Sequence, residues 1–146
     1  MGTAILGNSN QLWALVATAV VVLIGCGRQT IERPPTYQVR GRVFFGGQPT
    51  TGAEVLLWGL GDPKLNGLCP HAIVDANGSF RMTTYKTGDG APPGQYALTL
   101  TWPTPPAPGM DDGPDRFRGR YADPARPLLR IQVVTSNVEL EPIYLQ

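Results

Sequence analysis

The chain is poor in the side chains from which metal centres are built. Its 146 residues contain one histidine, His71, and two cysteines, Cys26 and Cys69. A single histidine cannot make a multi-histidine metal site, and cysteines this far apart do not form a Cys-x-x-Cys pair. The sequence therefore predicts no bound metal and no cofactor.

The usual parts of a nucleophilic active site are also missing. The only serines are Ser9, Ser79 and Ser136, and none stands in a Gly-x-Ser-x-Gly motif. The aspartates within 111–115 could supply an acid and a base, but on a loop rich in proline and glycine we expect them to be solvated surface charge. We therefore expect no catalytic residues and a non-enzymatic protein.

Charged residues are few, at 16% of the chain, and the formal net charge is +1. The sequence has no basic arm and no acidic tail, so nucleic acid is not an expected partner. Glycine and proline are abundant instead, with 18 and 15 copies. This composition is typical of short strands joined by many turns, and it favours an all-β fold.

No charged side chain precedes Arg28. Residues 12–24, LWALVATAVVVLI, form an apolar run with the length of a signal-peptide core, whereas a membrane-spanning helix needs about 20 such residues. The sequence Leu-Ile-Gly before Cys26 resembles a bacterial lipobox. We expect cleavage before Cys26 and lipidation of its thiol, although the first eleven residues lack the Lys or Arg of an ordinary signal peptide.

These features divide the chain into a lipoprotein signal peptide at 1–25, a lipidated N-terminus and tether at 26–36, and one domain at 37–146. Acyl chains on Cys26 would anchor the domain to a bacterial membrane in the cell envelope, facing the periplasm or the exterior. An uncleaved anchor and ordinary secretion are the alternatives. Cys69 would then be the only free thiol, and we expect it to be buried and unreactive.

Within the domain, apolar and polar residues alternate over short segments, which predicts strands with one face in a core. The clearest alternation, at 96–102, is expected at the centre of a sheet. The run at 53–58 is apolar throughout, so we expect it to be buried on both faces or packed at an edge. The expected strands are 37–45, 53–58, 72–74, 79–84, 96–102, 129–133 and 138–141.

Turn and loop signals separate these strands. Asn77-Gly78 predicts a tight hairpin turn that joins two strands. Segments 59–70 and 103–127 are expected to be surface loops, the second because it carries seven prolines. Seven short strands with this spacing predict a seven-stranded antiparallel Greek-key β-sandwich of the immunoglobulin or prealbumin-like kind.

Four segments carry a resemblance to a known family, and together they span nearly all of residues 37–146. They are VRGRV at 39–43 with GQP at 47–49 and GAEV at 52–55, VDANGSF at 74–80, GDGAPPGQY at 88–96, and RYADP at 120–124. In this order they resemble the transthyretin-like, or carboxypeptidase regulatory-like, domains of bacterial lipoproteins. The resemblance implies a seven-stranded sandwich, but it transfers no function because this fold serves many.

Two groups of residues are candidates for ligand binding. Arg116, Arg118 and Arg120 alternate with other residues, so on an extended segment they would share one face and grip carboxylate or phosphate groups. Ion pairs with the preceding aspartates are the alternative. Trp58 is out of phase with its strand and expected to be exposed, so with Tyr121 it could form an aromatic platform for sugars. Trp102 is in phase and expected in the core.

The sequence therefore predicts a non-enzymatic envelope lipoprotein whose sandwich is a structural or protein-binding module. Its expected partners are the membrane, through the lipid on Cys26, and an envelope protein or polysaccharide. The alternatives are a carbohydrate-binding module that uses exposed aromatic rings, and an envelope enzyme with an unrecognised site.

Overall fold

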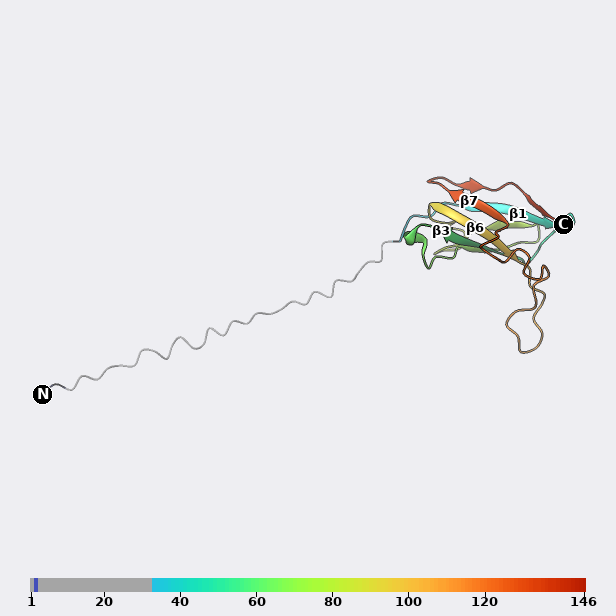
Figure 1. Cartoon of the computed structure of the whole chain (residues 1–146), viewed down its shortest axis with the longest axis horizontal. Coiled ribbons are helices and arrows are strands. Elements are labelled where there is room, and N and C mark those ends of the chain that lie inside the picture. Colours follow the sequence, from blue (N-terminus) through green and yellow to red (C-terminus); the bar gives the residue numbers. More distant parts are fainter. Residues whose placement is uncertain (1, 3–32) are drawn as a thin grey trace. The chain divides into compact units, whose positions relative to one another are not determined.

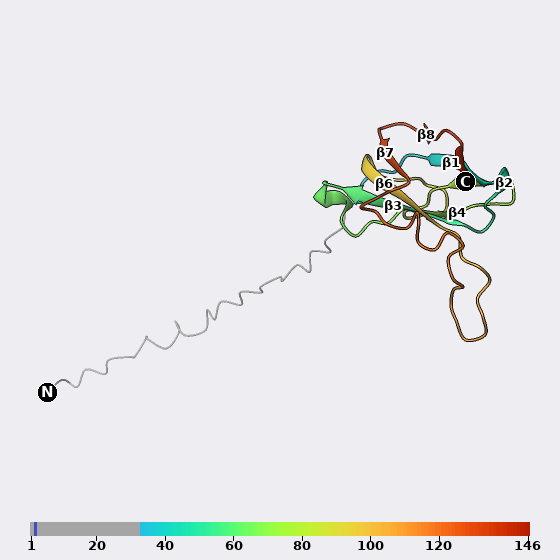
Figure 2. The ribbon, with the colours of Figure 1, turned by 45° about the vertical axis from the view of Figure 1, so that its right-hand side comes forward.

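The computed structural model describes Gly2 and residues 33–146, and the latter form an all-β sandwich of two facing sheets (Figures 1 and 2). The expected signal peptide, the lipidation site Cys26 and most of the tether lie outside the described residues. In the described part of the chain, no helix is both long enough and apolar enough to cross a membrane.

The expectation of a β-sandwich is confirmed, but its pairing is not wholly antiparallel as expected, because two of the strand pairs are parallel. All seven expected strands are present, and two short ones, β2 and β9, join them. The strands are β1 (Val39–Phe45), β2 (Gln48–Pro49), β3 (Glu54–Leu60), β4 (His71–Ile73), β5 (Ser79–Arg81), β6 (Gly94–Thr101), β7 (Leu129–Val133), β8 (Val138–Glu139) and β9 (Ile143–Leu145), with a short 3-10 helix at Pro63–Leu65.

Strand β1 is the centre of the first sheet and is paired along both edges. One edge pairs antiparallel with β5 and β2, and the other pairs parallel with β8 and β9. Residue 40 shows this arrangement, because it lies opposite Arg81 on one side and Glu139 on the other. The second sheet has the order β4-β3-β6-β7 and is antiparallel throughout.

The core lies between the sheets and is built from alternate residues of their strands. Val39 and Val43 of β1 face Val55 and Leu57 of β3, and all four side chains are fully buried. Close packing also demands a glycine at position 41, where an added Cβ would stand 2.8 Å from the ring of Phe80. Most of the folding free energy comes from this apolar burial.

Strand β6 is buried on both faces, which confirms its expected central position. Tyr96 points into the core, while Thr99 on the opposite face is covered by Trp58, whose indole N–H donates to the threonine hydroxyl at 2.8 Å. The expectation for 53–58 is wrong in part. Only alternate side chains of β3, Val55 and Leu57, are fully buried, whereas Leu56 and Trp58 on the outer face keep part of their surface exposed.

The predicted hairpin turn forms, but the strands that it joins belong to different sheets. Asp75 accepts the N–H groups of Asn77 and Ser79 on one carboxylate oxygen, and Gly78 takes a φ of +80°. Strand β4 before this turn pairs with β3, whereas β5 after it pairs with β1. The turn therefore carries the chain from one layer of the sandwich to the other.

A second carboxylate organises the loop between β5 and β6. Asp89 accepts the backbone N–H groups of Thr84, Tyr85 and Lys86 at 2.7 to 3.0 Å. Partial burial is the largest single influence and raises the pKa of Asp89, but the backbone hydrogen bonds together outweigh it, so the pKa lies below its ordinary value. The charged form of Asp89 therefore stabilises the folded loop.

Replacement of Asp89 by Asn should lower the free energy of unfolding at neutral pH by about 1 kcal/mol, since charge-assisted bonds at a partly exposed site are lost. The folded pKa is depressed, so the contribution is complete above the unfolded pKa and declines as the pH falls through the folded one. Urea unfolding of both proteins from pH 7 to pH 2 measures this. The two curves should converge in acid, and a constant difference would contradict the assignment.

Candidate functional site

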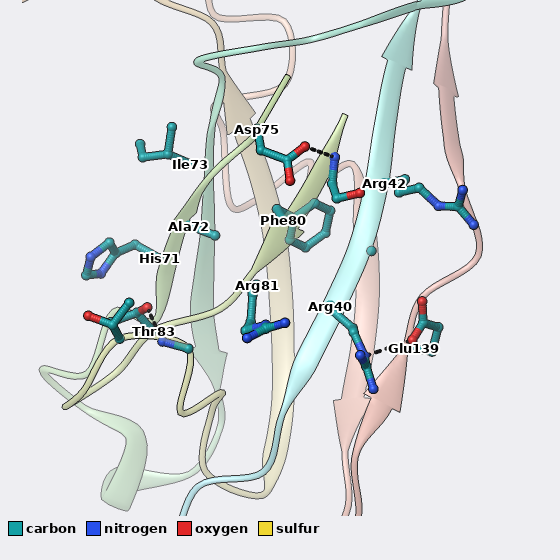
Figure 3. Close-up of a pocket in the computed structure, with 14 residues that line it drawn as sticks. Arg40, Arg42, His71, Ala72, Ile73, Asp75, Phe80, Arg81, Thr83 and Glu139 are labelled. Atoms are coloured by element: carbon teal, nitrogen blue, oxygen red, sulfur yellow. Dashed lines mark hydrogen bonds and ion pairs between the residues drawn. The ribbon is translucent and has the colours of Figure 1, made fainter. Parts of the chain in front are cut away.

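An open groove lies on the described surface beside β1 and β5 (Figure 3). Its volume is about 780 Å³, and β4 and the segment after β5 complete its walls. We call it the arginine groove and define it by the lining residues on which the argument depends: Arg40, Arg42, Ile73, Ser79, Arg81 and Thr87.

The groove exists because β4 and β5 separate between two points of contact. At one end His71 and Thr83 exchange two backbone hydrogen bonds, and at the other the N–H of Asp75 donates to the carbonyl of Ser79. Between them, at Ile73, the two chains form no ladder, since β4 pairs with β3 and β5 with β1. A pocket opens where the chain passes from sheet to sheet.

Like charges meet on the outer face of this groove. Arg40 of β1 lies directly opposite Arg81 of β5, and both side chains are exposed. Arg40 is balanced by Glu139, whose Oε2 is 2.9 Å from its Nε. Among the described residues no carboxylate forms an ion pair with Arg81. Figure 3 shows Arg40 and Arg81 as neighbours on adjacent strands.

Asp75 also lines the groove, but among the described residues it forms no ion pair with Arg81. One of its oxygens accepts the N–H groups of Asn77 and Ser79 in the turn. The guanidinium of Arg81 is therefore available to an external anion. Phosphate and carboxylate groups suit it, because they match the planar fork of donors on arginine.

The expected arginine row on the loop is not formed. Arg116, Arg118 and Arg120 lie in turns rather than on an extended segment, and Arg118 has a φ of +51°. Two of the three are held by aromatic rings, Arg116 at 4.5 Å from the centre of Trp102 and Arg120 at 5.3 Å from that of Tyr121. The prediction that the three arginines share one face is wrong, because it required an extended backbone and the segment forms turns.

The alternative of ion pairs with the preceding aspartates is wrong as well. Asp115 accepts the backbone N–H groups of Trp102, Phe117 and Gly119 at 2.7 to 3.1 Å. Together with the bond from the N–H of Arg116 to the carbonyl of Trp102, these bonds close the base of the loop. The rest of this loop projects from the sandwich, as expected for a surface segment (Figure 2).

The structure does not bring the two candidate aromatic residues together. Trp58 is 40% exposed, as its phase predicted. Tyr121 is half-buried with its ring edge against Phe117, 5.1 Å between centres, in a cluster that also holds Trp102 and Phe45. Trp102 is accordingly only partly buried, at the end of the core. No aromatic contact in the described chain links Trp58 to Tyr121, so no common platform is formed.

Cys69 is exposed, which corrects the expectation of a buried thiol. Cys69 lies in the loop after the 3-10 helix, and composition alone could not show that this loop leaves the thiol at the surface. Partial burial still raises the pKa of the Cys69 thiol, so the reactive thiolate is disfavoured at neutral pH. In residues 33–146, no three His, Cys, Asp or Glu side chains are grouped to hold a metal ion.

The arginine groove was missed by reasoning from the sequence. Alternation alone placed Arg40 and Arg42 on the outer face of their strand. Nothing local indicated that β5 would pair with β1, and only that pairing brings Arg81 opposite Arg40. The sequence signal that could have indicated the site was the presence of Arg40, Arg42 and Arg81 at outward positions of two predicted strands.

The fold and groove define the class of this protein as a small β-sandwich with an open basic surface. No protein-family model matches the chain, and no curated protein is similar to it. It is similar to the crystal structure of a DUF3823 family protein from Parabacteroides merdae, with 16% sequence identity and a TM-score of 0.41. That similarity covers 74% of this chain and 45% of the other, so the chain spans less than half its length.

Replacement of Arg81 by Thr should stabilise the fold, because two like charges directly opposite each other on neighbouring strands are unfavourable. We expect the free energy of unfolding to rise by about 0.2–1 kcal/mol at low salt and by less at high salt. Chemical denaturation at two ionic strengths measures the change. Arg130→Thr is the matched control, since exposed Arg130 on β7 lies opposite Ala97, and an equal gain there would refute the explanation.

Proposed function

We propose that this protein is a lipid-anchored, non-enzymatic module of the bacterial cell envelope, and that its sandwich binds a partner in the arginine groove. The sequence around Cys26 supports the anchor, and the groove of the domain supports the binding role. The transthyretin-like resemblance fits such a module, since domains of this fold commonly serve as non-catalytic parts of envelope proteins.

The observation that carries the binding role is Arg81 beside an open hollow, because no carboxylate of the described residues balances its charge. Its position opposite Arg40 on the neighbouring strand is unfavourable for the stability of the domain. An anionic partner would offset this charge on binding, and Arg81 would then add to affinity. A surface that served only for solubility would gain nothing from placing the two side chains opposite each other.

The proposed anchor depends on one thiol. Acylation of Cys26 adds several chains, and each buried CH₂ contributes about 0.8 kcal/mol to membrane attachment. The scarcity of histidine, cysteine and serine is what supports a non-catalytic role. The carbohydrate-binding alternative has less support, because no ring contact among the described residues joins Trp58 to Tyr121.

Replacement of Cys26 by Ala should abolish processing and membrane attachment. Intact mass spectrometry of the wild-type protein is expected to show loss of residues 1–25 and a diacylglyceryl adduct on Cys26, and fractionation should place it with membranes. Cys69→Ala is the matched control and should leave both results unchanged. A wild-type mass with residues 1–25 retained and no adduct would contradict the proposed anchor.

A photo-reactive amino acid at Thr87, an exposed position on the groove wall, should capture a partner in native envelopes. The same group at the exposed Gln132 on β7 is the control and should give no such product. Arg81→Glu in the Thr87 background should remove the product, since the charge at the groove is reversed. A product that persists in Arg81→Glu, or none at Thr87, would refute binding at this groove.

A further inference from the structure

We infer that the arginine groove recognises an extended acidic segment of another protein, with one carboxylate held by Arg81. This inference rests on the proposed function, because it names the partner of the same groove.

The guanidinium of Arg81 has donors that suit a carboxylate. Arg40 is engaged by Glu139, whose Oε2 lies 2.9 Å from its Nε. Arg81, in contrast, forms no ion pair among the described residues. A carboxylate bound in the groove would therefore receive charge-assisted hydrogen bonds from Arg81.

The surroundings of this pair suit a polypeptide better than a sugar. Ile73 lines the same groove and is 56% exposed, so an apolar side chain of the partner can be buried against it. No tryptophan or tyrosine of the described chain lines the groove, and its one phenylalanine, Phe80, is 4% exposed and offers no ring face for stacking. Polysaccharide sites usually present such a face, and this groove does not.

The exposed side chains of two strands supply a second feature suited to a peptide. Arg81 of β5 and Ile73 of β4 line the same groove, and both are exposed. In an extended segment every second side chain faces the same surface. A segment with an acidic residue and an apolar residue two positions apart would therefore present both side chains to the groove.

The position of Arg81 within the groove makes a membrane surface a poor ligand. The groove is a hollow of about 780 Å³ between strands, and Arg81 lies among its walls rather than on a protruding tip (Figure 3). A flat array of headgroups reaches protruding basic residues more readily than recessed ones. A narrow, extended chain enters such a hollow with its side chains.

The full acylated protein in detergent micelles provides the test, with a fluorescein-labelled octapeptide of sequence Glu-Ser-Val-Ser-Glu-Ser-Val-Ser as the probe, in which Glu and Val share one face of an extended chain. Fluorescence anisotropy should show binding that weakens as salt is raised. Arg81→Gln should reduce affinity about tenfold, as expected for the loss of charge-assisted bonds. Glu139→Gln should leave affinity equal or higher, because it frees Arg40. Arg130→Gln, on the other sheet, should have no effect.

Three further probes separate the alternatives. A peptide with Gln in place of Glu, soluble polygalacturonate, and phosphatidylglycerol vesicles without detergent should each bind the wild type and Arg81→Gln equally or not at all. Arg81-dependent binding of polygalacturonate or of vesicles, with no peptide binding, would overturn the inference in favour of that ligand. Equal peptide affinity of wild type and Arg81→Gln would overturn it outright.

The inference and the proposed function fail in different ways. If the groove variant abolishes capture at Thr87 in envelopes while the acidic peptide does not bind, the module binds a partner of other chemistry and only the inference is lost. If capture at Thr87 is absent as well, the binding function itself is lost.

Discussion

The pairing of β1 along both edges is the constraint on which the first sheet depends. Antiparallel β5 holds one edge and parallel β8 and β9 hold the other, so the last residues of the chain are needed to complete the layer that starts at Val39. This pairing determines which residues lie beside the outward side chains of β1. Arg40 stands between Glu139 and Arg81 for that reason, with one charge balanced and the other left free.

Reasoning from the sequence predicted the fold well, because period-two alternation reports directly on burial. The segment at 96–102 was placed at the centre of a sheet, and β6 lies there. Pairing was harder to predict, since strands that are distant in sequence carry no local mark of their partner. The turn at Asp75 was recognised as a turn, but its two strands diverge into separate sheets.

The candidate site was predicted poorly for the same physical reason. Alternation on the loop suggested that Arg116, Arg118 and Arg120 share a face, but this assumed an extended backbone. Asp115 instead binds three backbone N–H groups, which folds the segment into turns and sets the arginines against aromatic rings. Register and loop closure are tertiary properties, and they decide which charges become neighbours.

The closed base of the projecting loop has a consequence for how this protein can diverge. Asp115 and Trp102 hold the two ends of the loop together, so the residues between them are not needed for the packing of the core. Insertions, deletions or an epitope sequence at residues 105–112 would be tolerated there. Homologous chains could therefore differ greatly in the length of this loop while keeping the same two sheets.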